Sequence, residues 1–259
     1  MATLHVPRWP GVTPANAQDI SVTAPDKARL RAWWFPAPQP NGGCVIILHG
    51  IGDSRTGVAG LSTMFLNEGY SVLVPDSRAH GDSDGKFVTY GLLERYDVIA
   101  WAHKMRSLGC RKVYGLGESL GASILIQAAV VEPAFAAIVA ESPYADLREI
   151  GAYRVQWMTH LPAFLAKAVV SSSVFYARHV DGLDLAAVSP VRDIARASTP
   201  ILLIHGLADR RTPAWNSEEL ARANTRNALW LVPGGDHVNA SSVAPEEFRR
   251  RVLGWFREH

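Results

Sequence analysis

The sequence is poor in cysteine, in net charge and in long apolar runs, and each shortage excludes a class of protein. Two cysteines, Cys44 and Cys110, are too few for a disulfide framework or a cysteine-based zinc site. The 26 Lys and Arg residues exceed the 24 Asp and Glu residues by only two, unlike the strongly basic balance of a nucleic-acid-binding protein. The most apolar stretch, residues 161–176, contains Lys167 and is shorter than the ~20 residues that span a bilayer.

The first residues also lack the basic start and following apolar run of a signal peptide. We therefore expect a cytoplasmic protein with no membrane span and no nucleic-acid partner. In that compartment Cys44 and Cys110 are predicted to be free thiols without a catalytic part. No H-E-x-x-H or comparable ligand spacing occurs, so no metal site is predicted.

Short apolar runs that alternate with helical patterns dominate what is present. Hydrophobic residues make up 48% of the 259 residues, which is enough for a large core. The runs that read as buried strands are residues 45–49, 71–75, 112–115, 136–140, 201–205 and 229–232. Helical patterns cover residues 57–69, 90–107, 119–131, 216–224 and 245–257. Such alternation predicts an α/β fold, a parallel sheet with helices on both faces, preceded by an antiparallel hairpin at residues 19–23 and 29–35.

One gap between predicted strands is much longer than the others. It separates Glu141 from Ile201 and is rich in aromatic residues. We predict a core of residues 1–141 and 199–259 and a helical cap at residues 142–198. Trp157 and Phe164 in this cap are candidate substrate-binding residues, although such aromatics could instead only pack the cap onto the core.

The pattern Gly-x-Ser-x-Gly occurs twice, around Ser119 and around Ser83. In a nucleophile elbow the serine stands between a strand and a helix. Ser119 has a strand-like run before it and an apolar helical pattern after it, whereas Ser83 lies between two aspartates that would repel an oxyanion. Ser119 is the predicted nucleophile, and Ser83 is predicted to be a turn residue.

A serine nucleophile needs a base, and the base needs an acid that orients it. His237 follows the last predicted strand through a glycine-rich loop, and Asp209 lies four residues beyond the strand ending at His205. Because carboxyl ends of parallel strands share one edge of the sheet, Ser119, Asp209 and His237 can converge there. Glu141 is the alternative acid, but it runs directly into Ser142 and Pro143, which leaves little loop to reach His237.

The segment His49-Gly50-Ile51-Gly52 follows the first predicted parallel strand. Its glycines allow a sharp turn that would point the Ile51 N–H at a reacting carbonyl oxygen. With the N–H of Leu120 it would form a two-donor oxyanion hole, and a plain tight turn is the alternative.

Together these motifs make the chain resemble the α/β-hydrolase superfamily. They occur in the order Ser119, Asp209, His237, and the phrase Glu141-Ser142-Pro143-Tyr144 is similar to the branch of prolyl-oligopeptidase-like and ABHD-type serine hydrolases. The resemblance implies the α/β-hydrolase fold, with a mostly parallel eight-stranded sheet and a cap after the sixth strand. It also implies hydrolysis without a metal or other cofactor.

The function that we predict is that of a serine carboxylesterase acting on uncharged, fairly apolar esters through an acyl-serine intermediate. Its partner would be a small-molecule ester. A thioesterase or a peptidase could use the same triad, and a non-catalytic ligand-binding protein on this fold is a further alternative. The acyl chain length and the oligomeric state are not specified by the sequence.

Overall fold

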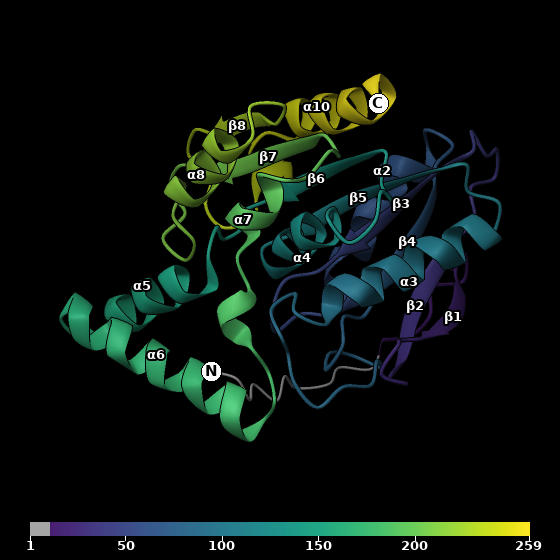
Figure 1. Cartoon of the computed structure of the whole chain (residues 1–259). Coiled ribbons are helices and arrows are strands. Elements are labelled where there is room, and N and C mark those ends of the chain that lie inside the picture. Colours follow the sequence, from purple (N-terminus) through teal and green to yellow (C-terminus); the bar gives the residue numbers. More distant parts are fainter. Residues whose placement is uncertain (1–10) are drawn as a thin grey trace.

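An eight-stranded sheet forms the centre of the computed structural model, which describes residues 11–259 (Figure 1). The strand order is β1-β2-β4-β3-β5-β6-β7-β8. The strands β1 (Gln18–Thr23) and β2 (Arg29–Phe35) pair antiparallel, and β2 also pairs antiparallel with β4 (Ser71–Pro75). All other pairings are parallel, and they join β4 to β3 (Gly43–Leu48), β5 (Lys112–Glu118), β6 (Ala137–Glu141), β7 (Ile201–Gly206) and β8 (Ala228–Val232). The predicted eight-stranded, mostly parallel sheet is therefore confirmed.

The central strands are mostly apolar because helices cover both faces of the sheet. All six residues of β3 are buried; Ile46 and Leu48 contact one apolar cluster, while Val45 and Ile47 contact the other. The first cluster includes residues of α3 (Glu94–Ser107), α4 (Leu120–Ala128), α7 (Pro190–Ile194) and α8 (Trp215–Ala223). The second includes residues of α1 (Arg55–Val58), α2 (Ser62–Leu66), α9 (Ala240–Val243) and α10 (Pro245–Glu258). The sheet thus separates two cores.

Two predicted helices differ from the structure. The pattern at residues 57–69 is split into α1, a 3-10 turn at Ala59–Leu61 and α2. The helix expected from residue 90 begins only at Glu94, because Tyr90 and Gly91 have φ of 56° and 101°. Residues in the left-handed region do not continue an α-helix.

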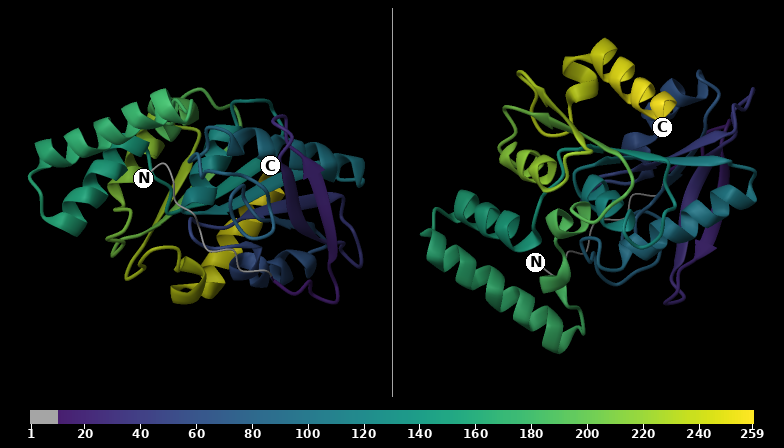
Figure 2. Two further views of the ribbon diagram at one scale, coloured as in Figure 1. Left: turned by 90° about the horizontal axis from the view of Figure 1, so that it is seen from below. Right: turned by 45° about the horizontal axis from the view of Figure 1, so that its top comes forward.

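Between β6 and β7 the chain forms a helical cap, as the resemblance implies. Here α5 (Leu147–Thr159) and α6 (Ala163–Val180) pack together as a helical hairpin, the α5–α6 hairpin, followed by a 3-10 turn at Leu185–Ala187. Asp146 accepts a hydrogen bond from the Arg148 N–H at the start of α5, and His160, with φ of 57°, ends it. Figure 2 shows the hairpin standing out from the core in both views. The boundaries at residues 142 and 198 stay a prediction.

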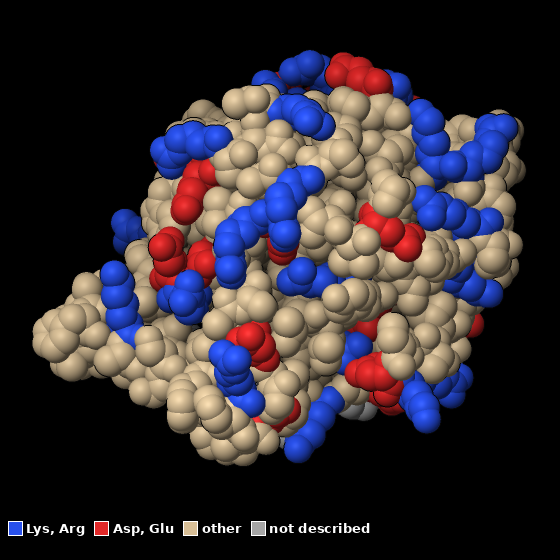
Figure 3. All heavy atoms as spheres, in the orientation of Figure 1, with Lys and Arg blue, Asp and Glu red and all other residues tan. Residues whose placement is uncertain are grey.

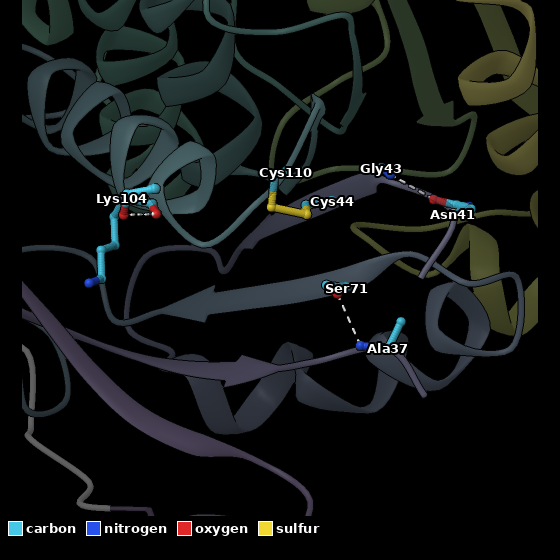
Figure 4. Close-up of a disulfide and its surroundings, with 8 residues drawn as sticks. Ala37, Asn41, Gly43, Cys44, Ser71, Lys104 and Cys110 are labelled. Carbon is cyan, nitrogen blue, oxygen red and sulfur yellow. Dashed lines mark hydrogen bonds between the residues drawn. A yellow bond between two sulfur atoms is a disulfide. The ribbon is translucent and has the colours of Figure 1, made fainter. Parts of the chain in front are cut away.

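Cys44 and Cys110 are joined by a disulfide, so the prediction of two free thiols is wrong (Figure 4). The pairing of β3 with β5 places Cys44 opposite Val113, and Cys110 lies two residues before β5, so the two Cα atoms are 5.7 Å apart. Both lie at the amino ends of their strands, away from the predicted site. The expectation of free thiols rested on a reducing compartment, in which disulfides are rare, and the cytoplasmic location stays a prediction.

Within residues 11–259, no helix has both the length and the apolar character needed to cross a membrane.

Candidate active site

Ser119 stands at the sharp turn between β5 and α4. Its φ of 53° lies in the left-handed region, and its N–H donates to the Glu141 carbonyl oxygen at 2.8 Å. The turn needs glycine on either side: a Cβ on Gly117 would lie 2.6 Å from the Ala122 nitrogen, and one on Gly121 would lie 2.5 Å from the Leu48 oxygen. Backbone strain that the surroundings hold in place is typical of functional turns.

Ser83, the serine of the second Gly-x-Ser-x-Gly match, is completely buried and hydrogen-bonded. Its hydroxyl donates to the Asp76 carbonyl oxygen at 2.7 Å and accepts from the Arg31 N–H at 2.9 Å. Both bonds fix its loop against β2 and the end of β4. A hydroxyl that is buried and bonded in this way cannot act as a nucleophile.

His237 lies between Ser119 and Asp209. Its Nε2 is 2.9 Å from Ser119 Oγ, so the hydroxyl can donate to it, and its Nδ1–H donates to Asp209 Oδ2 at 2.7 Å. The other oxygen of Asp209 accepts from the backbone N–H groups of Arg211 and Thr212. The carboxylate is thereby held in one orientation toward the imidazole. The structure brings together the three residues that the sequence singled out.

His205 also contacts this carboxylate and was missed by the sequence reasoning. It is completely buried, lies 3.4 Å from Asp209 Oδ2, and contacts Ser217 Oγ and the Thr212 carbonyl oxygen at 2.6 Å each. Although burial alone would raise it, hydrogen bonds from His205 and His237 hold the pKa of Asp209 well below its ordinary value. The signal that the sequence offered for this role was a histidine at the end of a predicted strand, four residues before the aspartate.

Glu141, the alternative acid, does not contact His237. Its Oε1 accepts the Ala240 N–H at 2.9 Å, and burial raises its pKa to about 7. The side chain therefore ties β6 to the start of α9, downstream of His237. Of the two candidate acids, the structure brings only Asp209 to the imidazole.

The two residues whose N–H groups are predicted to form an oxyanion hole, Ile51 and Leu120, belong to segments that adjoin Ser119. Leu120 is the first residue of α4, where N–H groups have no acceptor within the helix. Among the described residues, the Ile51 N–H donates to no backbone carbonyl of a turn or loop. A Cβ on Gly50 would be 3.4 Å from the Ser119 Cβ, so the Gly50–Ile51 turn runs directly past the serine. Ile51 and Leu120 line the same cavity as Ser119.

Two buried histidines hold that turn. His49 Nε2 accepts from the Ser77 N–H at 3.0 Å and its Nδ1–H donates to the Gly50 carbonyl; His80 Nε2 accepts from the Gly52 N–H at 3.3 Å. Their rings meet edge to face with centroids 5.0 Å apart. Burial, together with the neighbouring His80, lowers the pKa of His49 to about 3, and burial also lowers that of His80. Both stay neutral and keep an acceptor nitrogen at neutral pH.

A cavity of about 670 Å³ opens above Ser119, between the sheet edge and the α5–α6 hairpin. Apolar residues from the inner side of the hairpin form much of its wall, namely Leu147, Ile150, Met158, Val170 and Val174. Trp157 and Phe164 do not line it; they are 46% and 70% exposed. On α5 the lining residues recur at helical spacing, and Trp157 falls beside that stripe. The structure thus places the two aromatics outside the cavity for which they were proposed.

Glu118, the residue before the nucleophile, also lines the cavity. Burial, with smaller contributions from Glu141 and Asp53, raises its pKa to about 8. Its carboxyl group is therefore uncharged at neutral pH. The sequence reasoning missed it because the elbow pattern leaves this position unspecified.

This arrangement has the parts for acyl transfer: a hydroxyl, an imidazole that can take its proton, an oriented carboxylate and two N–H groups at a helix N-terminus and a tight turn. Among residues 11–259, no three His, Cys, Asp or Glu side chains gather in a way that could hold a metal ion. The cavity above the hydroxyl is large enough for a small organic molecule.

Comparison with known proteins agrees with this fold. The model of the alpha/beta hydrolase family matches residues 45–251. The Mycobacterium tuberculosis protein Rv2307c is 29% identical over 251 residues, covering 96% of this chain and 80% of the relative; Bacillus subtilis YqkD is 27% identical, covering 83% and 72%. Among solved structures, the Pyrococcus furiosus esterase Pf2001 is similar with a TM-score of 0.80 and 26% identity, covering 99% of this chain and 98% of the other.

Proposed function

Because this chain belongs to the alpha/beta hydrolase family, we propose that it is a serine esterase that cleaves carboxylic esters through an acyl-serine intermediate. The observation that carries the proposal is the unbroken pair of hydrogen bonds from Ser119 through His237 to Asp209, at 2.9 and 2.7 Å. This is the relay by which a serine hydroxyl loses its proton as it attacks.

In the proposed first half-reaction, Ser119 Oγ attacks the carbonyl carbon of the ester and His237 Nε2 takes the hydroxyl proton. The carbonyl oxygen becomes an oxyanion, which accepts hydrogen bonds from the Ile51 and Leu120 N–H groups. When the carbon–oxygen bond to the alcohol breaks, His237 gives the proton to the departing alcohol. Asp209 stabilises the imidazolium that exists between these two transfers.

In the second half-reaction a water molecule takes the place of the alcohol. His237 removes a proton from the water, the resulting nucleophile attacks the acyl carbon, and the carboxylic acid leaves as Ser119 regains its proton. One ester and one water give one acid and one alcohol.

We propose an uncharged, fairly apolar ester as the substrate class. Support comes from the cavity wall, where the inner sides of α5 and α6 present mostly aliphatic side chains, and from the uncharged state of Glu118 at neutral pH. The similar Pf2001 protein is described as an esterase.

The test compares the wild type with Ser119→Ala on p-nitrophenyl esters of increasing chain length, beside an acyl-CoA and a peptide amide. Ser119→Ala should lower kcat on the best ester by a factor on the order of 10⁶ and abolish labelling by a fluorophosphonate. Ser83→Ala is the matched control: it removes two structural hydrogen bonds and should lower the melting temperature but keep the labelling.

Loss of labelling in Ser83→Ala but not in Ser119→Ala would overturn the nucleophile assignment. Faster turnover of the acyl-CoA or the amide than of every ester would overturn the substrate class while leaving the mechanism in place.

A further inference from the structure

The outer side of α6 exposes an apolar surface that nothing in the proposed reaction uses. More than half of the large apolar side chains that are exposed among residues 11–259 lie on the α5–α6 hairpin. Those on α6, which we call the outer face, are between 40% and 70% exposed; they are Phe164, Leu165, Val169, Phe175, Tyr176 and Val180. In Figure 3 the projection at the lower left, where Figure 1 places the hairpin, is mostly tan.

The outer face occupies one side of α6, where the exposed Ser172 and His179 lie between its apolar side chains. At about 100° per residue its six side chains fall within an arc of roughly 160°, and the 18 residues of the helix give it a length of about 27 Å. The opposite side of α6 carries the buried residues Ala166, Val170 and Ala177, which pack toward α5 and the cavity. The helix is therefore apolar on two sides, and only one of them is covered by protein.

The charges along α5 and α6 are mostly positive, and the carboxylates lie at the ends, Glu149 in the first turn of α5 and Asp181 directly after α6. From residue 150 through residue 180 the sequence contains no Asp or Glu but includes Arg154, Lys167 and Arg178. Lys167 and Arg178 are exposed and about three turns apart on α6, so both lie along the same border of the outer face. An exposed apolar helix face bordered by cations is typical of a helix that lies in a membrane interface.

We propose that the outer face of α6 docks on the surface of an anionic phospholipid bilayer. The aromatic and aliphatic side chains would enter the headgroup region, and Lys167 and Arg178 would contact lipid phosphates. The helix would lie on the bilayer rather than cross it, in keeping with the absence of a spanning helix among the described residues. A second copy of the chain is the alternative occupant, and the test distinguishes it from the bilayer.

The proposal does not depend on catalysis, and the test measures binding of the whole chain to vesicles. Co-sedimentation with equimolar phosphatidylcholine and phosphatidylglycerol is compared with pure phosphatidylcholine. The double variant Phe175→Ser, Val180→Ser should bind the mixed vesicles at least about tenfold more weakly. Serine has nearly the helix propensity of phenylalanine and valine, so α6 should keep its structure.

The matched control is Tyr96→Ser, Leu108→Ser, which removes two exposed apolar side chains at α3, far from the hairpin. It should bind the vesicles as the wild type does. Lys167→Gln, Arg178→Gln should lose about fivefold in affinity per charge on mixed vesicles and little on pure phosphatidylcholine. Sedimentation equilibrium of each protein without lipid accompanies the binding assay.

Equal binding by the outer-face variant and the α3 variant would overturn the proposal. So would a wild-type dimer that the outer-face variant converts to a monomer while neither protein binds vesicles, because that result would assign the face to a second copy. Ser119→Ala should bind vesicles like the wild type, which separates this proposal from the proposed esterase activity.

Discussion

The sheet region and the α5–α6 hairpin differ in which side chains they bury and which they expose. In the sheet region even charged groups are buried and paired: Arg55, 1% exposed, forms ion pairs with Asp76 and Asp82, and Arg78, 4% exposed, forms ion pairs with Asp97 and Asp26. On the hairpin, aromatic side chains are exposed to water, and Glu149 in the first turn of α5 is the one acidic residue of the two helices. The groups of the proposed chemistry therefore come from the sheet region, and the hairpin contributes wall residues of the cavity.

The largest effect should come from breaking the fixed part of the site. Asp209→Asn should lower kcat by roughly 10⁴, about 5.5 kcal/mol, because the amide would favour the wrong tautomer of His237. Steady-state kinetics on one p-nitrophenyl ester measures this.

Glu141→Gln is the control for Asp209→Asn, since its carboxyl group binds the Ala240 N–H rather than the imidazole. It should cost far less in kcat. A greater loss in Glu141→Gln than in Asp209→Asn would transfer the orienting role to Glu141.

The second effect concerns stability in the sheet region rather than catalysis. Replacing both cysteines, Cys44→Ala and Cys110→Ala, should lower the free energy of unfolding by about 4 kcal/mol, because the bond closes a long loop in the unfolded chain. Urea denaturation with and without reductant measures the difference, and kcat at low temperature should be unchanged. An identical midpoint for wild type and variant would mean that the two thiols do not form the bond.

The third effect separates the two sides of α6. Val174→Phe, on the inner side, should narrow the cavity and lower kcat/KM for long-chain esters by about tenfold while sparing the acetate. The adjacent Phe175→Ala, on the outer side, should change neither value in aqueous assay. Equal effects of both substitutions would mean that the inner and outer sides of the helix are not functionally distinct.

The smallest effect should come from Glu118, where the two regions meet. With its pKa raised to about 8, the carboxyl group is neutral below that pH and becomes an anion beside the developing oxyanion above it. The rate should therefore fall about threefold to tenfold as the pH rises through about 8. Glu118→Gln should remove this decline, and the pH profile of kcat/KM measures it.

The same pKa has a consequence for stability. In the unfolded chain the group ionises near 4.5 but in the folded chain only near 8, so stability should decrease between these values as pH rises. Glu118→Gln should flatten that decrease, whereas Glu246→Gln, exposed at the start of α10, should not. A decline of equal size in all three proteins would exclude Glu118 as its cause.

The sheet and the convergence of Ser119, Asp209 and His237 could be predicted because strands, turns and motif spacing are local signals. A parallel sheet then brings the carboxyl ends of its strands to one edge without further information. The late start of α3 could not be predicted from apolar periodicity, since it depends on the left-handed conformation of Tyr90 and Gly91.

The cavity wall was harder to predict for a different reason. Composition predicts that the cap contains aromatics, but only the rotation of each helix decides which side chains face inward. Composition alone therefore favoured Trp157 and Phe164 as residues that line the cavity, whereas in the structure smaller aliphatic residues line it. The disulfide was missed for another reason, because the compartment expected from the sequence argued for free thiols.

The Cys44–Cys110 bond also decides what a protease can do to this molecule. It encloses α1, α2, β4 and α3, together with the exposed Lys86 in the loop before α3. A tryptic cut after Lys86 would leave two fragments still joined through sulfur, with the strand that leads to Ile51 held beside the strand that leads to Ser119. A nicked molecule would therefore keep the mass of the intact chain, apart from one added water, until a reductant released the pieces.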